Sequence, residues 1–271
     1  MSTNRDFLNF FNISETPFTR EFQIKNRVKF QHIENEALKL RNVIMRRQSG
    51  VIIGAAGMGK TVLLRSLRDN LPGAHIEFIY IKMAGLGLRD MTRQIADALR
   101  IDVKSGTSHL IKVMEAHFTE HYKDKNIQYV LALDEAHEIK PNAFQLLKGI
   151  TNFNMDSKLI VSLILCGQLP LKDILCSSKF VDIKQRMNYY AMLRPLTKEE
   201  TFDYIKSRIQ FIGDLNIFTE RAMDEIHEIS KGTMRAIDAL SLLSMEKSFE
   251  KKVKVVDSEE VKEAMEALCL N

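Results

Sequence analysis

The chain has 271 residues, 45% hydrophobic and 27% charged, which is typical of a folded globular protein with one large domain or one domain and a small appendage. No apolar run approaches the ~20 residues that a membrane-spanning helix requires, so we expect no membrane partner. Cys166, Cys176 and Cys269 have neither metal-ligand spacing nor a disulfide framework, which favours a reducing cytoplasm. The net charge of +4 permits a polyanionic partner without requiring one.

Residues 1–30 are expected to form an irregular N-terminal arm. Aromatic residues recur between polar ones from Phe7 to Phe30, and Pro17 would break a long helix. We expect these aromatics to pin the arm to the main domain. The interleaved basic residues, among them Arg20 and Arg27, are compatible with nucleic-acid binding and equally with a packed extension whose charged face is solvated.

A helix over 32–47 and a short buried strand over 50–53 are predicted to precede a glycine-rich turn. The strand, Gly50-Val51-Ile52-Ile53, is apolar and β-branched, as a parallel strand buried on both faces should be. The next residues, Gly54-Ala55-Ala56-Gly57-Met58-Gly59-Lys60-Thr61, have the spacing of a P-loop, and a helix begins near Val62. Strand, turn and helix together are the context that this motif requires.

The P-loop predicts a binding site for the polyphosphate of ATP. Its glycines let the backbone curl so that N–H groups point inward, and the following helix N-terminus adds partial positive charge. Lys60 is expected to reach the β- and γ-phosphates, and Thr61 to ligate Mg²⁺. The expected nucleotide contacts in this segment are Gly54, Ala55, Ala56, Gly57, Met58, Gly59, Lys60, Thr61 and Val62.

Two carboxylates follow a strongly apolar strand over 129–133. Asp134 and Glu135 complete a Walker B pattern there. At the carboxyl edge of a parallel sheet, Asp134 would lie beside the P-loop and hold Mg²⁺ directly or through water, and Glu135 would polarise the attacking water. A solvated acidic turn is the alternative for such a string alone, but its position after a P-loop favours the Walker B interpretation. The elements between the two motifs are expected at 74–83 (strand), 89–99 and 108–121 (helices).

A polar residue ends the fourth predicted strand. After a helix over 142–154, the apolar run 159–166 leads to Gly167 and Gln168. A side chain at this strand end would lie between the P-loop and Asp134, so Gln168 is a candidate sensor of the γ-phosphate. The alternative is a simple turn residue.

The C-terminal third is expected to be entirely helical. A fifth strand is predicted over 188–193, and Thr197 to Glu200 form a capping box that opens a new helix. We therefore expect an α/β fold with a five-stranded parallel sheet flanked by helices, plus a helical lid. The expected regions are an arm (1–30), an ATPase domain (31–195) and a lid (196–271), with lid helices at 199–211, 219–230, 233–249 and 258–268.

These motifs, in this order, resemble the AAA+ ATPase family, and within it the ExeA/TniB/TnsC branch with its Mu B-like members. The resemblance covers nearly the whole chain. The P-loop is specific only for the superfamily. The branch is indicated by Gly167-Gln168-x-x-Leu171, by Gln185-Arg186, and by the run Pro195-Leu196-Thr197-x-Glu199-Glu200-Thr201.

The resemblance implies two further arginines at the nucleotide. Arg186, just before the fifth strand, would be an arginine finger that enters the site of a neighbouring subunit; the alternative is a surface salt bridge. Arg235, in Gly232-Thr233-Met234-Arg235, matches the sensor-two pattern of the lid and would otherwise be solvated. A finger acting in trans implies self-assembly into a ring or a helical filament.

The resemblance also implies partners. Proteins of the TnsC, TniB and Mu B type assemble on double-stranded DNA with ATP bound and recruit a transposase, so we expect DNA transposition as the process. Basic residues on loops of the α/β domain would face the DNA, and each is as compatible with simple solvation. The candidates are Lys82 and Arg89, then Lys179 and Lys184.

Two other functions remain open. ExeA-like proteins assist a secretion machine and add a membrane span and a peptidoglycan-binding region, neither of which is expected here. A nucleotide-gated signalling switch with a protein partner is the other alternative.

Overall fold

The computed structural model describes residues 4–19, 29–83, 85–102, 104, 106–150, 159–213 and 215–268. The chain divides into two compact units. The β/α unit is Gln31–Leu193, and the helical unit joins Met1–Phe30 to Arg194–Asn271. Among the described residues, none of the helices has both the length and the apolarity needed to cross a bilayer.

The β/α unit is built on a five-stranded sheet whose paired strands all run parallel. The three inner strands are buried along their whole length, which explains why their sequences are largely apolar. The two edge strands contain both buried and exposed residues. In spatial order the strands are β2 (Ile76–Lys82), β3 (Gln128–Asp134), β4 (Val161–Gly167), β1 (Ser49–Ile53) and β5 (Met187–Met192).

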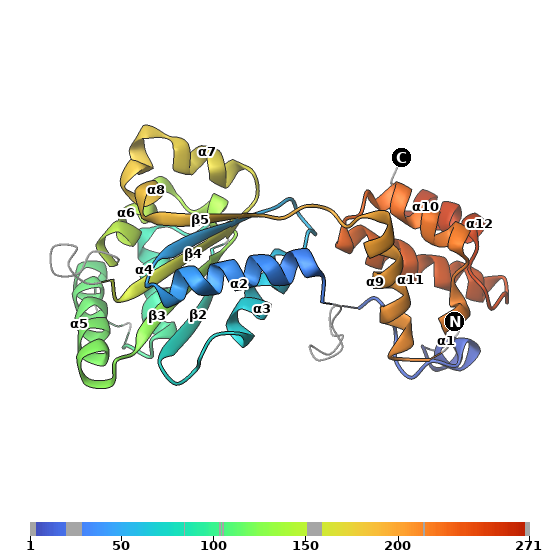
Figure 1. Ribbon diagram of the computed structural model, residues 1–271, viewed down its shortest axis with the longest axis horizontal. Helices are drawn as coiled ribbons and strands as arrows, with labels where there is room; N and C mark the ends of the chain where they lie inside the picture. Colours follow the sequence, from blue (N-terminus) through green and yellow to red (C-terminus); the bar gives the residue numbers. More distant parts are fainter. Residues whose placement is uncertain are drawn as a thin grey trace. The chain divides into compact units, whose positions relative to one another are not determined.

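Helices cover both faces of this sheet (Figure 1). One face carries α2 (Gln31–Met45) and α3 (Lys60–Asp69), which pack together. On the other face, apolar side chains of several helices join those of the strands in one core. These helices are α4 (Leu88–Ala98), α5 (Thr107–Lys125), α6 (Pro141–Ile150), α7 (Pro170–Cys176) and α8 (Val181–Arg186), with the short turns η2 (Ala136–Glu138) and η3 (Ser178–Phe180).

In its described residues, the helical unit contains α1 (Asn4–Phe11), four C-terminal α-helices and a short 3-10 turn. The expected capping box forms, because Thr197 accepts from the Glu200 amide (3.2 Å) and Glu200 accepts from the Thr197 amide (2.9 Å). The C-terminal elements are α9 (Lys198–Gln210), η4 (Leu215–Ile217), α10 (Glu220–Ser230), α11 (Met234–Glu250) and α12 (Ser258–Ala267).

The prediction of an irregular N-terminal arm pinned to the main domain is wrong for its first part. Residues 4–11 are helical, and residues 1–30 cluster with the C-terminal helices. The rings of Phe7 and Phe10 meet Phe249 of α11 edge-on, with centroids 5.7 and 5.2 Å apart. Their spacing of three residues puts both rings on one helix face, and this face packs against α11. Arg20 and Arg27 lie outside the described residues.

Other element boundaries differ from expectation by a few residues, and α5, for example, runs to Lys125 where the predicted helix ends at 121. The predicted helix over 142–154 corresponds to α6, which ends at Ile150, and residues 151–154 lie outside the described part. The β/α unit ends at Leu193, two residues before the expected boundary at 195.

Candidate nucleotide-binding site

The P-loop connects β1 to α3 with a backbone that depends on glycine. Gly57 and Gly59 have left-handed backbones, with φ of 80° and 85°. At Gly54 a Cβ atom would lie 3.0 Å from Cβ of Leu193, which is tighter than ordinary packing. The loop is therefore held in a tight curl that other residues would strain.

Lys60 is the buried cation of this loop. Its side chain is only 7% exposed, and Nζ donates to the carbonyl oxygens of Gly54 and Ala55, each at 3.0 Å. A buried ammonium requires compensation, and neutral carbonyls supply no negative charge. The surroundings of Lys60 therefore fit an anionic ligand seated in the loop.

The start of α3 provides donors to the same anion. Gly59 is the N-cap residue and has no side chain that could accept from the first amides of the helix. These amides and the helix dipole favour a phosphate at this point. The loop, Lys60 and the helix start together fit the polyphosphate of a nucleotide.

Asp134 lies at the end of β3 beside Thr61. The carboxylate is nearly buried, and its Oδ2 lies 3.5 Å from Oγ1 of Thr61. Oδ1 accepts from the Glu135 amide at 2.9 Å, and Oδ2 accepts from the Tyr80 hydroxyl at 2.8 Å. Burial and this bond to Asp134 raise the pKa of the Tyr80 phenol above its usual range. A carboxylate and a hydroxyl adjacent to a phosphate cradle fit Mg²⁺, which prefers such oxygen ligands.

Glu135 has an unusual backbone and an unsatisfied oxygen. Its φ of 56° and ψ of 37° are left-handed, which is uncommon for a residue other than glycine. Its Oε2 atom is buried and accepts no hydrogen bond in the described part of the chain. Nδ1 of His137 lies 3.6 Å away. A buried carboxylate oxygen with unused acceptor capacity suits a group that binds a water molecule.

Gln168 follows β4, which lies between β1 and β3. The backbone N–H of Gln168 donates to Nδ1 of His137 at 3.4 Å. The backbone N–H of Gly54 donates to the Gly167 carbonyl oxygen at 3.2 Å. The strand order thus brings the ends of three strands together, and Gln168 lies at the middle one. Its role as a sensor stays a prediction.

The two arginines implied by the family resemblance belong to other elements of the chain. Arg186 ends α8 and precedes β5. Because β5 pairs in parallel with β1, Arg186 lies at the amino end of these strands, opposite the P-loop at their carboxyl end. It is therefore not part of the same chain's phosphate site. Arg235 is an exposed residue in the first turn of α11, in the helical unit.

The four candidate DNA contacts form two separate pairs. Lys82 and Arg89 are exposed and flank the loop between β2 and α4, at one edge of the sheet. Lys179 and Lys184 lie in η3 and α8, before β5 at the opposite edge. Lys140 lies near the loop between β2 and α4, because its Cδ atom is 3.9 Å from the position that a Cβ atom on Gly87 would occupy.

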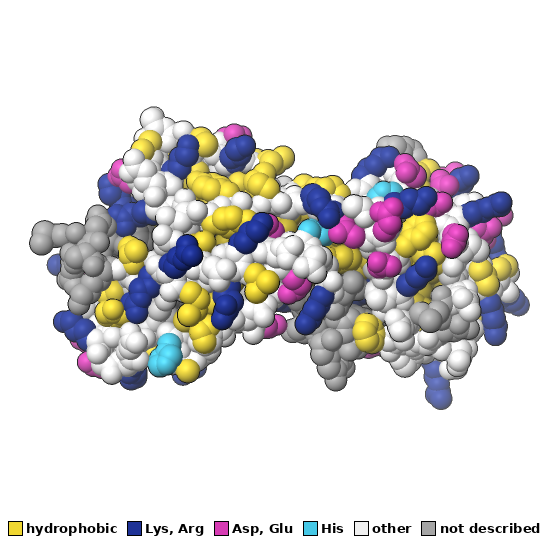
Figure 2. Space-filling model, viewed as in Figure 1, with side chains coloured by type: hydrophobic (Ala, Val, Ile, Leu, Met, Phe, Trp, Pro, Cys, Tyr) yellow, Lys and Arg dark blue, Asp and Glu magenta, His cyan; other side chains and the backbone are white. Residues whose placement is uncertain are grey.

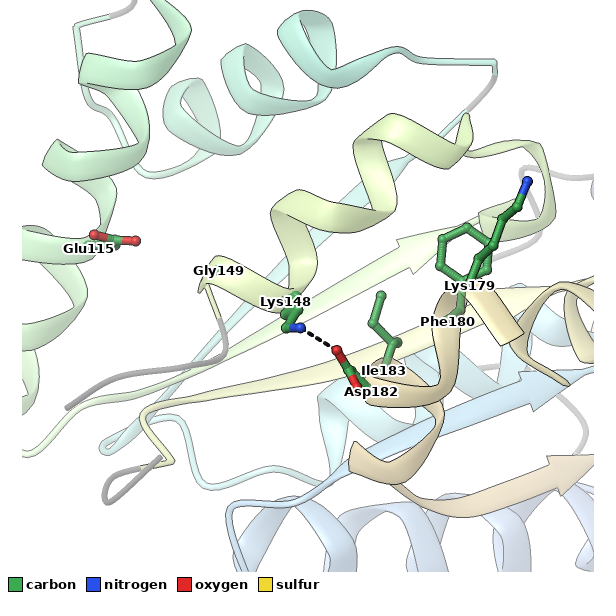
Figure 3. Close-up of a pocket in the computed structure, with 7 residues that line it drawn as sticks. All are labelled: Glu115, Lys148, Gly149, Lys179, Phe180, Asp182 and Ile183. Atoms are coloured by element: carbon green, nitrogen blue, oxygen red, sulfur yellow. Dashed lines mark hydrogen bonds and ion pairs between the residues drawn. The ribbon is translucent and has the colours of Figure 1, made fainter. Parts of the chain in front are cut away.

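Acidic side chains and a thiol lie near the second pair. Lys179 lines a cavity of about 590 Å³ together with Glu115 and Asp182. Figure 3 shows the Lys179 side chain directed away from the ion pair that Lys148 forms with Asp182. Lys184 Nζ lies 3.4 Å from Sγ of Cys176. These contacts make the second pair the weaker candidate for a polyanion.

Charge is distributed unevenly between the two units. Residues 31–193 contain the excess of Lys and Arg over Asp and Glu, whereas the rest of the chain has a slight acidic excess. In Figure 2, Lys and Arg side chains are spread over the α2 face of the β/α unit, and Asp and Glu side chains gather over α9 and α10. The β/α unit is thus the better match for a polyanion.

Three residues near the site were not identified from the sequence. Tyr80 contacts Asp134. His137 contacts both Glu135 and the backbone N–H of Gln168. Lys140 lies beside the loop between β2 and α4. For His137 the signal was its position two residues after Glu135. Nothing local identified Tyr80 or Lys140, because their positions depend on strand register and on a contact between separate loops.

Comparison with known proteins also finds an AAA domain in this chain. Residues 42–175 match the family model described as AAA domain. General secretion pathway protein A of Aeromonas hydrophila is 28% identical over 242 residues, which is 86% of this chain. The chain spans only 43% of that relative's length.

Solved structures share the fold. Cdc6p from Pyrobaculum aerophilum has a TM-score of 0.75 at 18% identity, covering 94% of this chain and 71% of that one. The ORC1 protein of Aeropyrum pernix, in complex with DNA, has a TM-score of 0.71 at 18% identity, with coverage of 90% and 67%. The RuvB Holliday junction branch migration motor of Thermotoga maritima has a TM-score of 0.59 at 20% identity, with coverage of 91% and 74%.

The fold is that of AAA+ P-loop proteins, and the site is that of an ATPase. More particularly, the chain carries an AAA domain over residues 42–175 and is similar in sequence to a general secretion pathway protein A. The cofactors of this class are ATP and Mg²⁺.

Proposed function

We propose that this chain is an ATP-driven switch whose ATP-bound form assembles with further copies on double-stranded DNA and recruits a transposase. The observation that carries the nucleotide part is the convergence of Lys60, Asp134 and Glu135 at the carboxyl ends of β1 and β3, the two strands on either side of β4. The DNA part is supported by the basic excess of the β/α unit and by the exposed residues Lys82 and Arg89.

Each residue has a distinct part in the proposed chemistry. Lys60 exchanges its carbonyl partners for phosphate oxygens and neutralises their charge. Asp134 and Thr61 hold Mg²⁺, which draws electron density from the phosphates when bound. Glu135 accepts a hydrogen bond from the attacking water and orients it toward the γ-phosphate, while Gln168 contacts that phosphate.

Self-assembly completes the site in this proposal. Arg186 lies at the opposite end of the sheet from its own P-loop, so it would stabilise the transferring phosphate only in a neighbouring copy. Arg235 would contact the γ-phosphate from the helical unit. Arg186→Ala should leave ATP binding by the single chain intact and remove any increase of turnover with protein concentration.

Fluorescence anisotropy of a labelled duplex tests the DNA part. With an ATP analogue and Mg²⁺ the chain should bind DNA, and the affinity should fall steeply as salt rises. Lys82→Ala combined with Arg89→Ala should weaken binding and reduce the salt slope by about 2. Lys179→Ala combined with Lys184→Ala is the matched comparison and should change the slope less. No binding at low salt with the analogue would contradict the proposal.

A secretion-accessory ATPase is the second candidate, and the similarity to general secretion pathway protein A favours it. This function requires nucleotide-dependent contact with proteins and not with DNA. A chain that hydrolyses ATP but shows no nucleotide-dependent DNA affinity would favour this candidate or a signalling switch with a protein partner.

A further inference from the structure

Tyr80 connects the edge of the sheet to the candidate metal site. In the register of β2 on β3, Lys82 is paired with Asp134 and Tyr80 with Ala132. Residues paired in this way face the same side of the sheet, so the long Tyr80 side chain reaches Asp134 diagonally. Its hydroxyl donates to Oδ2 of Asp134 at 2.8 Å.

Of the hydrogen bonds described for the Oδ2 atom, this one is the shortest. Oδ1 accepts from the Glu135 amide at 2.9 Å, whereas Thr61 Oγ1 lies 3.5 Å from Oδ2, and the Cys166 thiol also hydrogen-bonds this carboxylate. The last torsion of an aspartate is broad, so a carboxylate held at one oxygen rotates easily. Tyr80 and the Glu135 amide together fix its plane.

Burial of the ring alone does not explain why a tyrosine occupies position 80. It is 47% exposed and lines a cavity of about 260 Å³ on the α3 side of β2. The cavity is also lined by Thr61, Leu64, Arg65, Arg68 and Phe78. Tyr80 leaves half of its surface in solvent, while its hydroxyl contacts a nearly buried acid.

We propose that Tyr80 is a positioning residue that orients the Asp134 carboxylate for Mg²⁺. This inference rests on the proposed function of the nucleotide site. Tyr80 acts through Asp134 and touches neither the phosphates nor the metal. Loss of its hydroxyl lowers the contribution of Mg²⁺ to nucleotide affinity and leaves metal-free nucleotide binding unchanged. Groups that orient metal ligands typically change metal affinity by tenfold or more when removed.

The test is a Mg²⁺ titration of the affinity for a fluorescent ATP analogue, with wild type and Tyr80→Phe. The Mg²⁺ concentration for half-maximal enhancement should rise about tenfold in the variant. Metal-free affinity and the melting temperature should be unchanged. An unchanged Mg²⁺ requirement overturns the proposal. A lower requirement also overturns it, because the phenol would then be competing with the metal.

Tyr189→Phe is the matched control. Tyr189 lies on the other edge strand, β5, and its hydroxyl donates to Oε2 of Glu36 at 2.7 Å, again a phenol–carboxylate pair. It should leave the Mg²⁺ titration as in wild type. A shift equal to that of Tyr80→Phe would indicate a general effect of losing such a bond and would overturn the proposal.

A double variant identifies the route of the effect. If Tyr80 acts through Asp134, then Tyr80→Phe added to Asp134→Asn should cause no further loss. An additive loss overturns the proposal. If the wild type binds no nucleotide, the proposed function and this inference are both overturned. If the wild type binds nucleotide with the expected Mg²⁺ dependence and Tyr80→Phe has the same Mg²⁺ requirement, only the inference is overturned.

Discussion

At the scale of single residues, Glu135 has a backbone conformation that costs free energy, and its neighbours hold it in place. A left-handed conformation costs a residue other than glycine about 1–3 kcal/mol, and surrounding contacts must impose it. The bond from its amide to Oδ1 of Asp134 is one such contact. This turn directs the Glu135 carboxylate so that one oxygen is buried and accepts no hydrogen bond in the described structure.

Lys60→Ala should abolish nucleotide binding. The variant removes the one buried cation of the loop, and losing such a partner of a buried phosphate should lower affinity about a hundredfold or more. Isothermal titration with ATP analogue and Mg²⁺ measures this. Lys39→Ala, at an exposed lysine paired with Glu36, is the control and should bind as wild type does. Equal affinities of the two variants would refute the assignment of Lys60.

Glu135→Gln should bind ATP normally but hydrolyse it slowly. Glutamine keeps the size of the side chain and removes the charge that polarises water, an effect worth about a hundredfold or more in turnover. Parallel measurements of affinity and steady-state phosphate release separate binding from chemistry. Turnover at the wild-type rate would show that another group activates the water.

At this scale the sequence was informative where the signal is local. Residues 54–61 follow one another, so spacing alone identified Lys60 and Thr61 as candidates. Asp134 was identified by the apolar strand before it. Tyr80 could not be identified, because its contact depends on how β2 registers on β3.

At the scale of elements, the order of strands determines which strand ends meet. The order along the chain is β1 to β5, but β4 lies between β1 and β3 in space. This insertion puts Gln168 between the P-loop and Asp134. The apolar runs predicted the three inner strands well, because strands buried on both faces are largely apolar in sequence. Helix α1 was missed because the apolar partner of its phenylalanines is the distant Phe249.

Gly232→Ala should destabilise the helical unit. Gly232 has a φ of 71°, and an added Cβ would lie 2.1 Å from the Leu196 carbonyl oxygen. Backbone strain and this clash together should lower the free energy of unfolding by more than about 2 kcal/mol. Urea unfolding followed by circular dichroism measures the change. Gly73→Ala, where an added Cβ meets nothing within 4 Å, should be nearly neutral, and equal effects would contradict the packing described for Gly232.

Asp238 of α11 should make the helical unit less stable as pH rises from about 4 to about 6. Burial raises the pKa of its carboxyl from 3.8 to about 6, although Arg208 and the Tyr204 hydroxyl, 2.8 Å away, act to lower it. The folded state therefore holds this proton more tightly than the unfolded chain, and the stability present below pH 4 is lost as pH approaches 6.

Asp238→Asn provides the measurement. The variant removes the titration and keeps an acceptor for Tyr204, so the difference in free energy of unfolding between wild type and variant should change by about 2 kcal/mol across this pH range. Urea unfolding at a series of pH values determines that difference. A difference that does not vary with pH would show that Asp238 titrates normally.

At the scale of the whole molecule, the chain separates a basic β/α unit from a slightly acidic helical unit. The nucleotide candidates, apart from Arg235, all lie in the basic unit. Arg186 and the P-loop lie at opposite ends of one sheet, which suits a head-to-tail contact between copies. Length and composition could indicate a large domain with an appendage, but not that residues 1–30 belong to the C-terminal helices, since that grouping depends on non-local contacts.

Sedimentation velocity of the chain with a labelled DNA duplex tests the central claim most directly, namely that nucleotide controls assembly on DNA. With Mg²⁺ and a non-hydrolysable ATP analogue, wild type should sediment with the duplex as a species larger than one chain per DNA. Without nucleotide, or with Lys60→Ala, protein and duplex should sediment separately. A wild type that stays monomeric and free of DNA when saturated with the analogue would contradict the account.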